Sequence, residues 1–318
     1  MAITRPNILT NAGPMQQYVT GVNLLKNEFT GPTTTSLGIS GPSRPVSTYD
    51  LFVVWHHTAM STMTPPTQGD RNAAHRGPVF CPWHRFMLRQ LELNLQRILN
   101  DNTFGLPYWD WAADGQNTAA QQKKSAIWGP DALGGSGNPV KTGPFKYTAT
   151  NPQSFRVRIE ADVNGQLVQR DHGLRRALGT QISTLPTKID TGSALTLTPY
   201  DATPWDTSSS GFRNRVEGWA PPAAPALHNR VHVWVGGDML PSSSPNDPVF
   251  YLNHCNVDRI WEAWLTQQGR RYLPLQTAPA SLKGHRINDH MSSLVSPSTK
   301  PSDVLDMRAI YVYDSLAV

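Results

Sequence analysis

Apolar side chains recur at helical spacing in several separate stretches of this chain. The clearest stretch begins at Pro82, a residue favoured in the first turn of a helix, and is predicted to end near Asn100. Its apolar positions follow a period of about 3.6 residues and are Phe86, Leu88, Leu91, Leu95, Ile98 and Leu99. A second helix is predicted over residues 49–57, where an apolar run follows the potential cap residues Ser47 and Thr48.

Weaker patterns complete the predicted architecture. Further helices are expected over residues 15–26, 211–219, 226–234 and 249–267, and a short strand over 155–159. Residues 114–200 and 272–318 otherwise resemble loops, and a Pro-rich link covers 221–225. We therefore expect a mainly α fold with a four-helix bundle core, long loops and a few short strands, in one domain covering residues 1–318. Loops of this length argue against a compact domain unless a metal centre ties the helices together.

Composition and charge narrow the function classes. The 318 residues include 27 Pro and 24 Gly, too many for a coiled coil, and 16% charged residues, too few for a disordered chain. The net charge of +5 is spread without a basic tract, which argues against a nucleic-acid partner. The longest apolar run is too short for a membrane span, and the first residues lack a signal-peptide pattern. These features predict a cytoplasmic protein with no membrane association.

The candidate chemistry lies in the ten histidines. His228 and His232 are four residues apart, so on a helix both imidazoles share one face, as two ligands of one metal require. His84 lies at the start of the clearest helix, with His75 nine residues upstream. His254 lies in another predicted helix. A single buried histidine is usually a hydrogen-bonded core residue, but several apolar helices that each carry one jointly favour a metal cluster.

The ligand type indicates the metal. No carboxylate pattern of a zinc hydrolase or di-iron bundle accompanies these histidines, and an all-imidazole set suits copper. Six imidazoles could hold two copper ions, and such a pair could bind O2. Asp258, one turn after His254, could orient that ligand. The remaining histidines in polar surroundings are expected at the surface: His172, His285 and His290.

Several segments resemble tyrosinases and related type 3 copper proteins. Residues 75–86, HRGPVFCPWHRF, resemble their first copper motif, and residues 227–237, LHNRVHVWVGG, with 244–250, SPNDPVF, are similar to the second. Further matching segments are 5–7, 52–56, 106–111 and 128–131. The resemblance is closest to bacterial, streptomycete-like tyrosinases, covers nearly the whole chain and is weakest over 137–200.

The resemblance implies a dinuclear copper centre with O2 as co-substrate. Copper A would be held by His56, His75 and His84. Copper B would be held by His228, His232 and His254. His57 is then a neighbour of the centre. Glu217 matches the family's carboxylate that positions a water near copper, and Asn229 matches the residue that helps this water accept a phenol proton.

One departure bears on the substrate. In tyrosinases a second histidine usually precedes the last copper B ligand, whereas this chain has Asn253 there, a feature of the o-aminophenol oxidase branch. An amide at the pocket edge could hydrogen-bond to a substrate amino group or phenolate, although the exchange could also be neutral. Ala73 excludes the thioether crosslink that some relatives form. Cys81 and Cys255 are expected as buried thiols near the metals without a catalytic role.

We therefore expect an oxidase of o-aminophenols and catechols that forms quinone imines or o-quinones. The alternatives are a tyrosinase that also hydroxylates monophenols, a haemocyanin-like O2 carrier and a zinc-loaded structural protein. Residues 311–313, YVY, resemble the motif that closes the family's catalytic domain, so no C-terminal shielding domain is expected. The resemblance then implies either a mature form or an enzyme loaded with copper by a separate caddie-type chaperone, and export together with that chaperone is the alternative to a cytoplasmic location.

Overall fold

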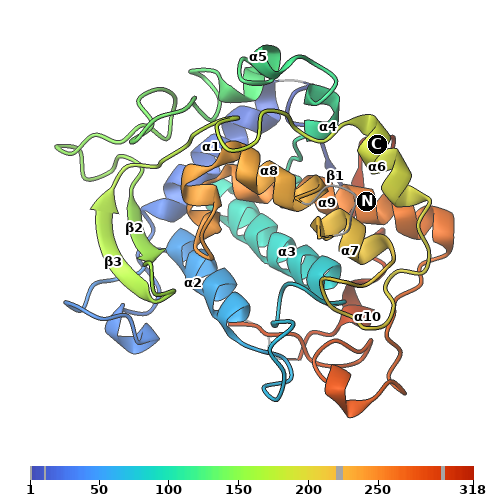
Figure 1. Ribbon diagram of the computed structural model, residues 1–318. Coiled ribbons are helices and arrows are strands. Elements are labelled where there is room, and N and C mark those ends of the chain that lie inside the picture. Colours follow the sequence, from blue (N-terminus) through green and yellow to red (C-terminus); the bar gives the residue numbers. More distant parts are fainter. Residues whose placement is uncertain (1, 11, 220–224, 295–297) are drawn as a thin grey trace.

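The computed structural model describes residues 2–10, 12–219, 225–294 and 298–318 (Figure 1). Its longest helices are α1 (Ala12–Lys26), α2 (Thr48–Ser61), α3 (Phe80–Leu99) and α9 (Val249–Gln268). The shorter helices are α4 (Trp111–Asp114), α5 (Ala119–Gln122), α6 (Lys188–Leu195), α7 (Phe212–Glu217), α8 (Leu227–Val235) and α10 (Pro301–Val304). The strands are β1 (Ile3–Arg5), β2 (Val157–Ala161), β3 (Leu167–His172) and β4 (Tyr311–Tyr313). The mainly α architecture is confirmed.

The ends of the core helices follow local sequence signals. The Ser47 side chain accepts a hydrogen bond from the Asp50 amide at 3.1 Å and so caps α2, as predicted. Helix α3 ends where Asn100 takes a left-handed conformation with φ of 52°, and α9 ends at Gly269 with φ of 82°. Helices α3 and α9 pack against each other, and α8 packs against α9 (Figure 1). Trp55 of α2 lies against Trp83 of α3, with ring centroids 5.5 Å apart, so α2, α3, α8 and α9 surround one buried centre.

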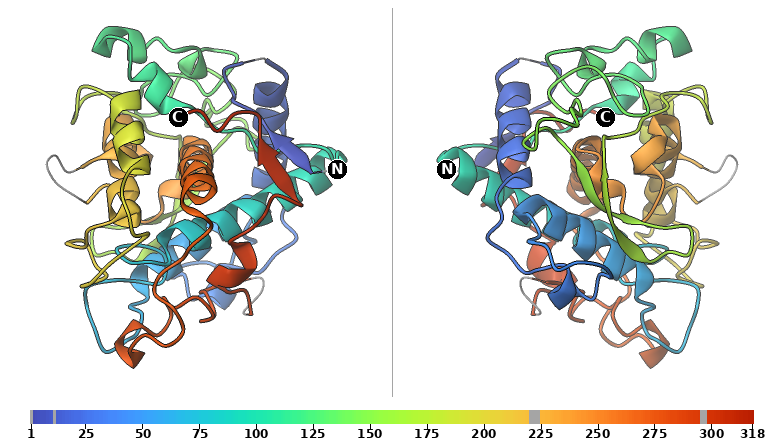
Figure 2. Two further views of the ribbon diagram at one scale, coloured as in Figure 1. Left: turned by 90° about the vertical axis from the view of Figure 1, so that its right-hand side faces the viewer. Right: turned by 90° about the vertical axis from the view of Figure 1, so that its left-hand side faces the viewer.

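Two small sheets lie outside the helical core. Strands β2 and β3 form an antiparallel hairpin in which Val157 is paired with His172. Strands β1 and β4 pair in parallel, with Ile3 opposite Tyr311, so segments from the two ends of the chain lie side by side (Figure 2). Among the described residues, no helix combines the length and the apolar character needed to cross a bilayer.

The region expected as loop contains more structure than its sequence indicated. The strand predicted over 155–159 overlaps β2, but its partner β3 and helix α6 were not predicted. Helix α6 begins at a reciprocal cap in which Thr187 and Asp190 exchange hydrogen bonds. The Pro-rich link at 221–225 lies outside the described residues except for its last member.

The prediction that Asp258 orients His254 is wrong. The carboxylate of Asp258 instead accepts hydrogen bonds from Arg85 Nε at 2.5 Å and from the Tyr311 hydroxyl at 2.7 Å. It also accepts from Arg5 Nη1 at 3.2 Å. All of these groups are buried, so Asp258 joins α9 to α3 and to the paired strands β1 and β4. Asp258 lies one helical turn after His254, but its carboxylate is fully engaged by the two arginines and the tyrosine.

Candidate metal centre

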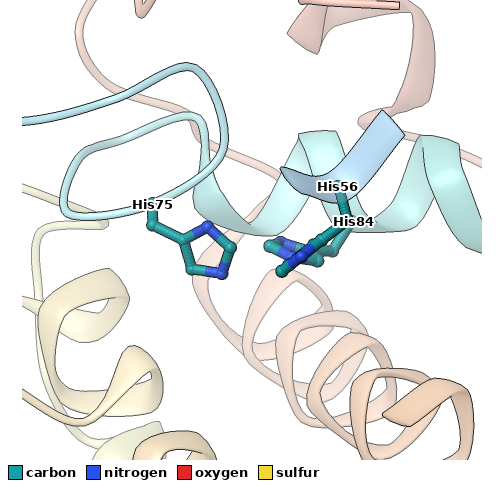
Figure 3. A group of neighbouring side chains, drawn as sticks. All are labelled: His56, His75 and His84. Atoms are coloured by element: carbon teal, nitrogen blue, oxygen red, sulfur yellow. The ribbon is translucent and has the colours of Figure 1, made fainter. Parts of the chain in front are cut away.

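Three imidazoles meet at one side of the buried centre. His56 comes from α2, His75 from the loop before α3 and His84 from α3 itself. One ring nitrogen from each lies within 4.8 Å of the others. Figure 3 shows the three rings turned toward one another from these separate segments. This is the predicted copper A group.

A second group of three imidazoles lies directly beside the first. It consists of His228 and His232 from α8 and His254 from α9, again with ring nitrogens within 4.8 Å of one another. The His84 and His254 rings stack with their centroids 4.1 Å apart. Two metal ions held by these groups would therefore be close neighbours, as a dinuclear centre requires.

Backbone carbonyls fix the orientation of three imidazoles. Nδ1 of His56 donates to the carbonyl of Ser242 at 2.7 Å, and Nδ1 of His232 donates to that of Met239 at 2.6 Å. Nδ1 of His84 donates to the carbonyl of Phe80 at 2.8 Å. A carbonyl only accepts, so each Nδ1 carries the proton and each Nε2 keeps a free lone pair. All three Nε2 atoms are buried without a hydrogen-bond partner among the described residues.

The protonation state also fits metal binding. Burial lowers the pKa of His56 to about 3 and that of His232 to about 4. The pKa of the other predicted ligands is likewise lowered well below the usual range by burial, namely for His75, His84, His228 and His254. Neutral imidazoles with unpaired buried nitrogens would be costly without a further partner. The two groups contain no carboxylate or thiolate, and this all-nitrogen donor set fits a pair of copper ions.

Of the four remaining histidines, three lie where the sequence predicts and one does not. Nδ1 of His57 contacts the Ser242 hydroxyl at 2.8 Å, beside the centre but outside both groups. His290 is exposed and His172 is half-buried, as a surface position requires. The surface prediction for His285 is wrong, because its side chain is fully buried and Nε2 donates to the Thr64 carbonyl at 2.9 Å.

Glu217 connects the two groups of ligands. Its backbone carbonyl lies 3.1 Å from Nδ1 of His228, and its carboxylate accepts from the Arg76 amide at 2.6 Å, one residue after His75. Nη1 of Arg213 donates to the same carboxylate at 3.0 Å. The side chain is fully buried, which raises the pKa of Glu217 above its ordinary value. Its predicted water-holding role stays a prediction.

The two asparagines differ in their surroundings. Asn229 lines the pocket over the centre, and its Oδ1 lies 3.0 Å from Nδ1 of His228. Asn253 is fully buried and does not line that pocket. The amide expected at the pocket edge therefore does not lie there. Both polar atoms of the Asn253 amide are without a hydrogen-bond partner among the described residues. A buried amide normally forms hydrogen bonds, and a ligand or a water could supply the partners that Asn253 lacks.

A pocket of about 290 Å³ opens onto the imidazoles. Four of the six predicted ligands contribute to its wall, namely His56, His75, His228 and His232. Trp219, Val233 and Leu240 add apolar surface. This volume suits a single aromatic ring with small substituents.

Two arginines of the site were not predicted from the sequence. Arg213 could have been found from its position four residues before Glu217, which places both side chains on one face of α7. Arg76 lines the pocket, and its position directly after a ligand in the first copper motif was the available signal. As expected, the thiols of Cys81 and Cys255 are buried; neither forms a disulfide, and burial raises the pKa of Cys255 to about 12.

Comparisons with known proteins agree with this geometry. The family model described as the common central domain of tyrosinase matches residues 46–267. Tyrosinase from Streptomyces glaucescens is 39% identical over 272 residues, which are 84% of this chain and 89% of the relative. Grixazone synthase from Streptomyces griseus is 36% identical over 291 residues, covering 84% of this chain and 90% of the relative.

Solved structures show the same fold at lower identity. A variant polyphenol oxidase from Thermothelomyces thermophila has a TM-score of 0.69 at 22% identity, covering 98% of this chain and 88% of that one. A functional unit of octopus hemocyanin has a TM-score of 0.54 at 19% identity, covering 99% of this chain and 69% of that one.

Proposed function

Because this chain belongs to the tyrosinase family of type 3 copper proteins, we propose that it oxidises o-aminophenols and catechols to quinone imines and o-quinones. Membership of the family makes the protein a copper oxidase that uses O2 as the oxidant, and the two imidazole groups are positioned to hold the copper pair. The copper pair, when bound, supplies the site at which O2 is reduced. In the balanced reaction two substrate molecules each lose two electrons and two protons, and one O2 becomes two waters.

The residues around the pocket supply binding and proton transfer. The apolar wall holds the substrate ring and limits water at the centre. The carbonyl of Glu217 and the side chain of Asn229 both contact Nδ1 of His228, so the two residues flank one ligand. The proposal places a water between Asn229 and the Glu217 carboxylate, which the Arg76 amide and Arg213 hold in position, and this water takes the proton of the substrate hydroxyl. Delivery of copper to these buried ligands by a separate chaperone is part of the proposal.

The preference for o-aminophenols depends on Asn253. A histidine at this position would be larger and titratable, whereas an amide can accept from an amino group and donate to a phenolate. The amide is unpaired among the described residues but is buried outside the wall of the pocket, so such a bond requires the substrate to reach beyond that wall, next to His254. The chain is 36% identical to a relative named grixazone synthase and 39% identical to one named tyrosinase, so these identities do not separate the two activities.

Tyrosinase activity is the second candidate, and Glu217 with Asn229 favours it. Both residues of the predicted water site are retained, and monophenol hydroxylation needs the same deprotonation. An O2 carrier is less well supported, because the pocket gives a substrate access to four of the predicted ligands.

The Asn253→His variant tests the proposal. Initial rates with o-aminophenol and with L-tyrosine give a ratio for each protein, and we expect this ratio to fall about tenfold in the variant because the site loses its amide. Asn288→His, at an exposed position, is the control and should keep the wild-type ratio. Wild-type protein that hydroxylates L-tyrosine much faster than it oxidises o-aminophenol would contradict the proposed preference.

A further inference from the structure

The pocket over the imidazoles carries one permanent charge. Among its described lining residues, Arg76 is the only one that is charged at every physiological pH, and none is a carboxylate. The sequence between residues 219 and 225 contains only Ala and Pro, so it adds no charge of its own. A substrate that enters this pocket therefore meets a cation without a neutralising anion in the wall.

The backbone of Arg76 is held in a fixed and uncommon conformation. Its φ is 62°, a left-handed value at which glycine is less strained than any residue with a side chain. The Arg76 amide donates to the Glu217 carboxylate at 2.6 Å, which fixes the main chain next to His75. A long cationic side chain at such a position suggests a function for the side chain rather than for the backbone.

The guanidinium of Arg76 is free to bind a ligand. Its central carbon lies 5.8 Å from the centre of the Trp219 ring, and no hydrogen bond or ion pair joins it to another described residue. Most buried arginines of the same protein are instead paired with carboxylates, as Arg213 is with Asp201 at 2.7 Å. Arg76 is exposed at the pocket mouth, so it keeps all its donors available.

We propose that Arg76 selects aromatic substrates that carry a carboxylate on the side of the ring away from the oxidised hydroxyl and amino groups. This inference rests on the proposed function, because it assumes that the reacting groups point toward the imidazoles. The planar guanidinium matches a carboxylate with two parallel hydrogen bonds. Trp219 lies beside it, so the same mouth offers a ring surface and a cation to one substrate.

Binding of unreactive probes separates this inference from the oxidase activity. Benzoate and benzamide have nearly the same shape, and only benzoate is charged. We expect calorimetry to show that wild-type protein binds benzoate about five- to tenfold more tightly than benzamide, and that Arg76→Gln brings the ratio close to one. Arg76→Lys should keep part of the preference, because it retains the charge without the planar fork. Arg271→Gln, at an exposed position outside the pocket, is the control.

Turnover gives the second readout. The ratio of kcat/KM for 3-amino-4-hydroxybenzoate over its uncharged amide should fall by a similar factor in Arg76→Gln and should fall in wild-type protein as salt is added. An unchanged benzoate preference in Arg76→Gln would overturn the inference, whatever the activity. A protein that binds benzoate through Arg76 but oxidises neither substrate would uphold the inference and contradict the proposed function.

Discussion

At the scale of single residues, the hydrogen bond on Nδ1 decides which nitrogen of an imidazole is available to a metal. His56 and His57 are adjacent, and both contact Ser242, yet they differ in their acceptors and in the groups they face. Nδ1 of His56 contacts a carbonyl and its Nε2 is buried and unpaired, whereas Nε2 of His57 lies 3.4 Å from the Ser61 hydroxyl. Of the two, only His56 has a buried, unpaired nitrogen that a metal could use.

Copper content provides a test of this distinction. We expect purified, copper-loaded His56→Gln to retain about one copper per chain in place of two, because one of the three copper A ligands is lost while the copper B group is intact. His57→Gln should retain two. Elemental analysis measures both values. Equal copper loss in the two variants would show that the assignment of ligand and neighbour is wrong.

At the scale of elements, the loop that carries His75 is held from outside by the C-terminal segment. The His285 imidazole donates to Thr64 in this loop, and a side chain at Gly77 would come within 2.9 Å of the ring. Nη2 of Arg71 adds a bond of 2.9 Å to the carbonyl of Ser281. The position of His75, a predicted copper A ligand, therefore depends on residues far along the chain.

We expect His285→Ala to lower the free energy of unfolding by about 2 kcal/mol, because it leaves a cavity and a buried carbonyl without its donor. His290→Ala, on the exposed side of the same segment, should have little effect. Urea unfolding of the copper-free proteins measures the difference. An His285→Ala protein as stable as wild type would show that the buried imidazole does not secure the loop.

The elements also show what a sequence can predict. Helix α3 was predicted because its apolar period, its proline and its terminal Asn100 are all local signals. The role of Asp258 was missed because its partners belong to strands from both ends of the chain, which no local pattern brings together. His285 was assigned to the surface from its polar neighbours in sequence, whereas its burial depends on the distant loop around Gly77.

At the scale of the whole molecule, a buried network of charges links both ends of the chain to the core. Nε of Arg5 donates to Glu92 on α3 at 2.8 Å, and its Nη1 reaches Asp258 on α9 at 3.2 Å. Its guanidinium also lies 3.5 Å from the centre of the Tyr311 ring. These contacts join β1 and β4 to the two longest core helices.

Removing one member of this network should be costly. We expect Arg5→Met to lower the free energy of unfolding by about 3–5 kcal/mol, because Glu92 and Asp258 would stay buried with less compensating charge. Arg308→Met, which removes an exposed ion pair with Asp306, should change little. Chemical denaturation of both variants checks the prediction, and similar stabilities of the two would contradict it.

The buried neutral histidines predict a pH dependence. Burial lowers the pKa of His285 to about 3, whereas in the unfolded chain it lies near 6.5. The unfolded state therefore binds the proton first as the pH falls. The folded state therefore has its full free energy of unfolding above about pH 6.5. Below this pH that free energy falls progressively, by about 2 kcal/mol per buried histidine at about pH 5. His56 and His232 act in the same direction in the copper-free protein.

The free energy of unfolding of wild-type protein should thus be lower near pH 5 than near pH 7. The same decrease should be about 2 kcal/mol smaller in His285→Ala, which lacks one buried histidine. Stability that stays level or rises on acidification would contradict neutral burial of these imidazoles.

Oxygen uptake by the copper-loaded wild-type protein tests the central claim most directly. With o-aminophenol as substrate, we expect one O2 to be consumed for every two molecules oxidised, at an initial rate above that with L-tyrosine. No oxygen uptake with o-aminophenol at full copper occupancy would contradict the account.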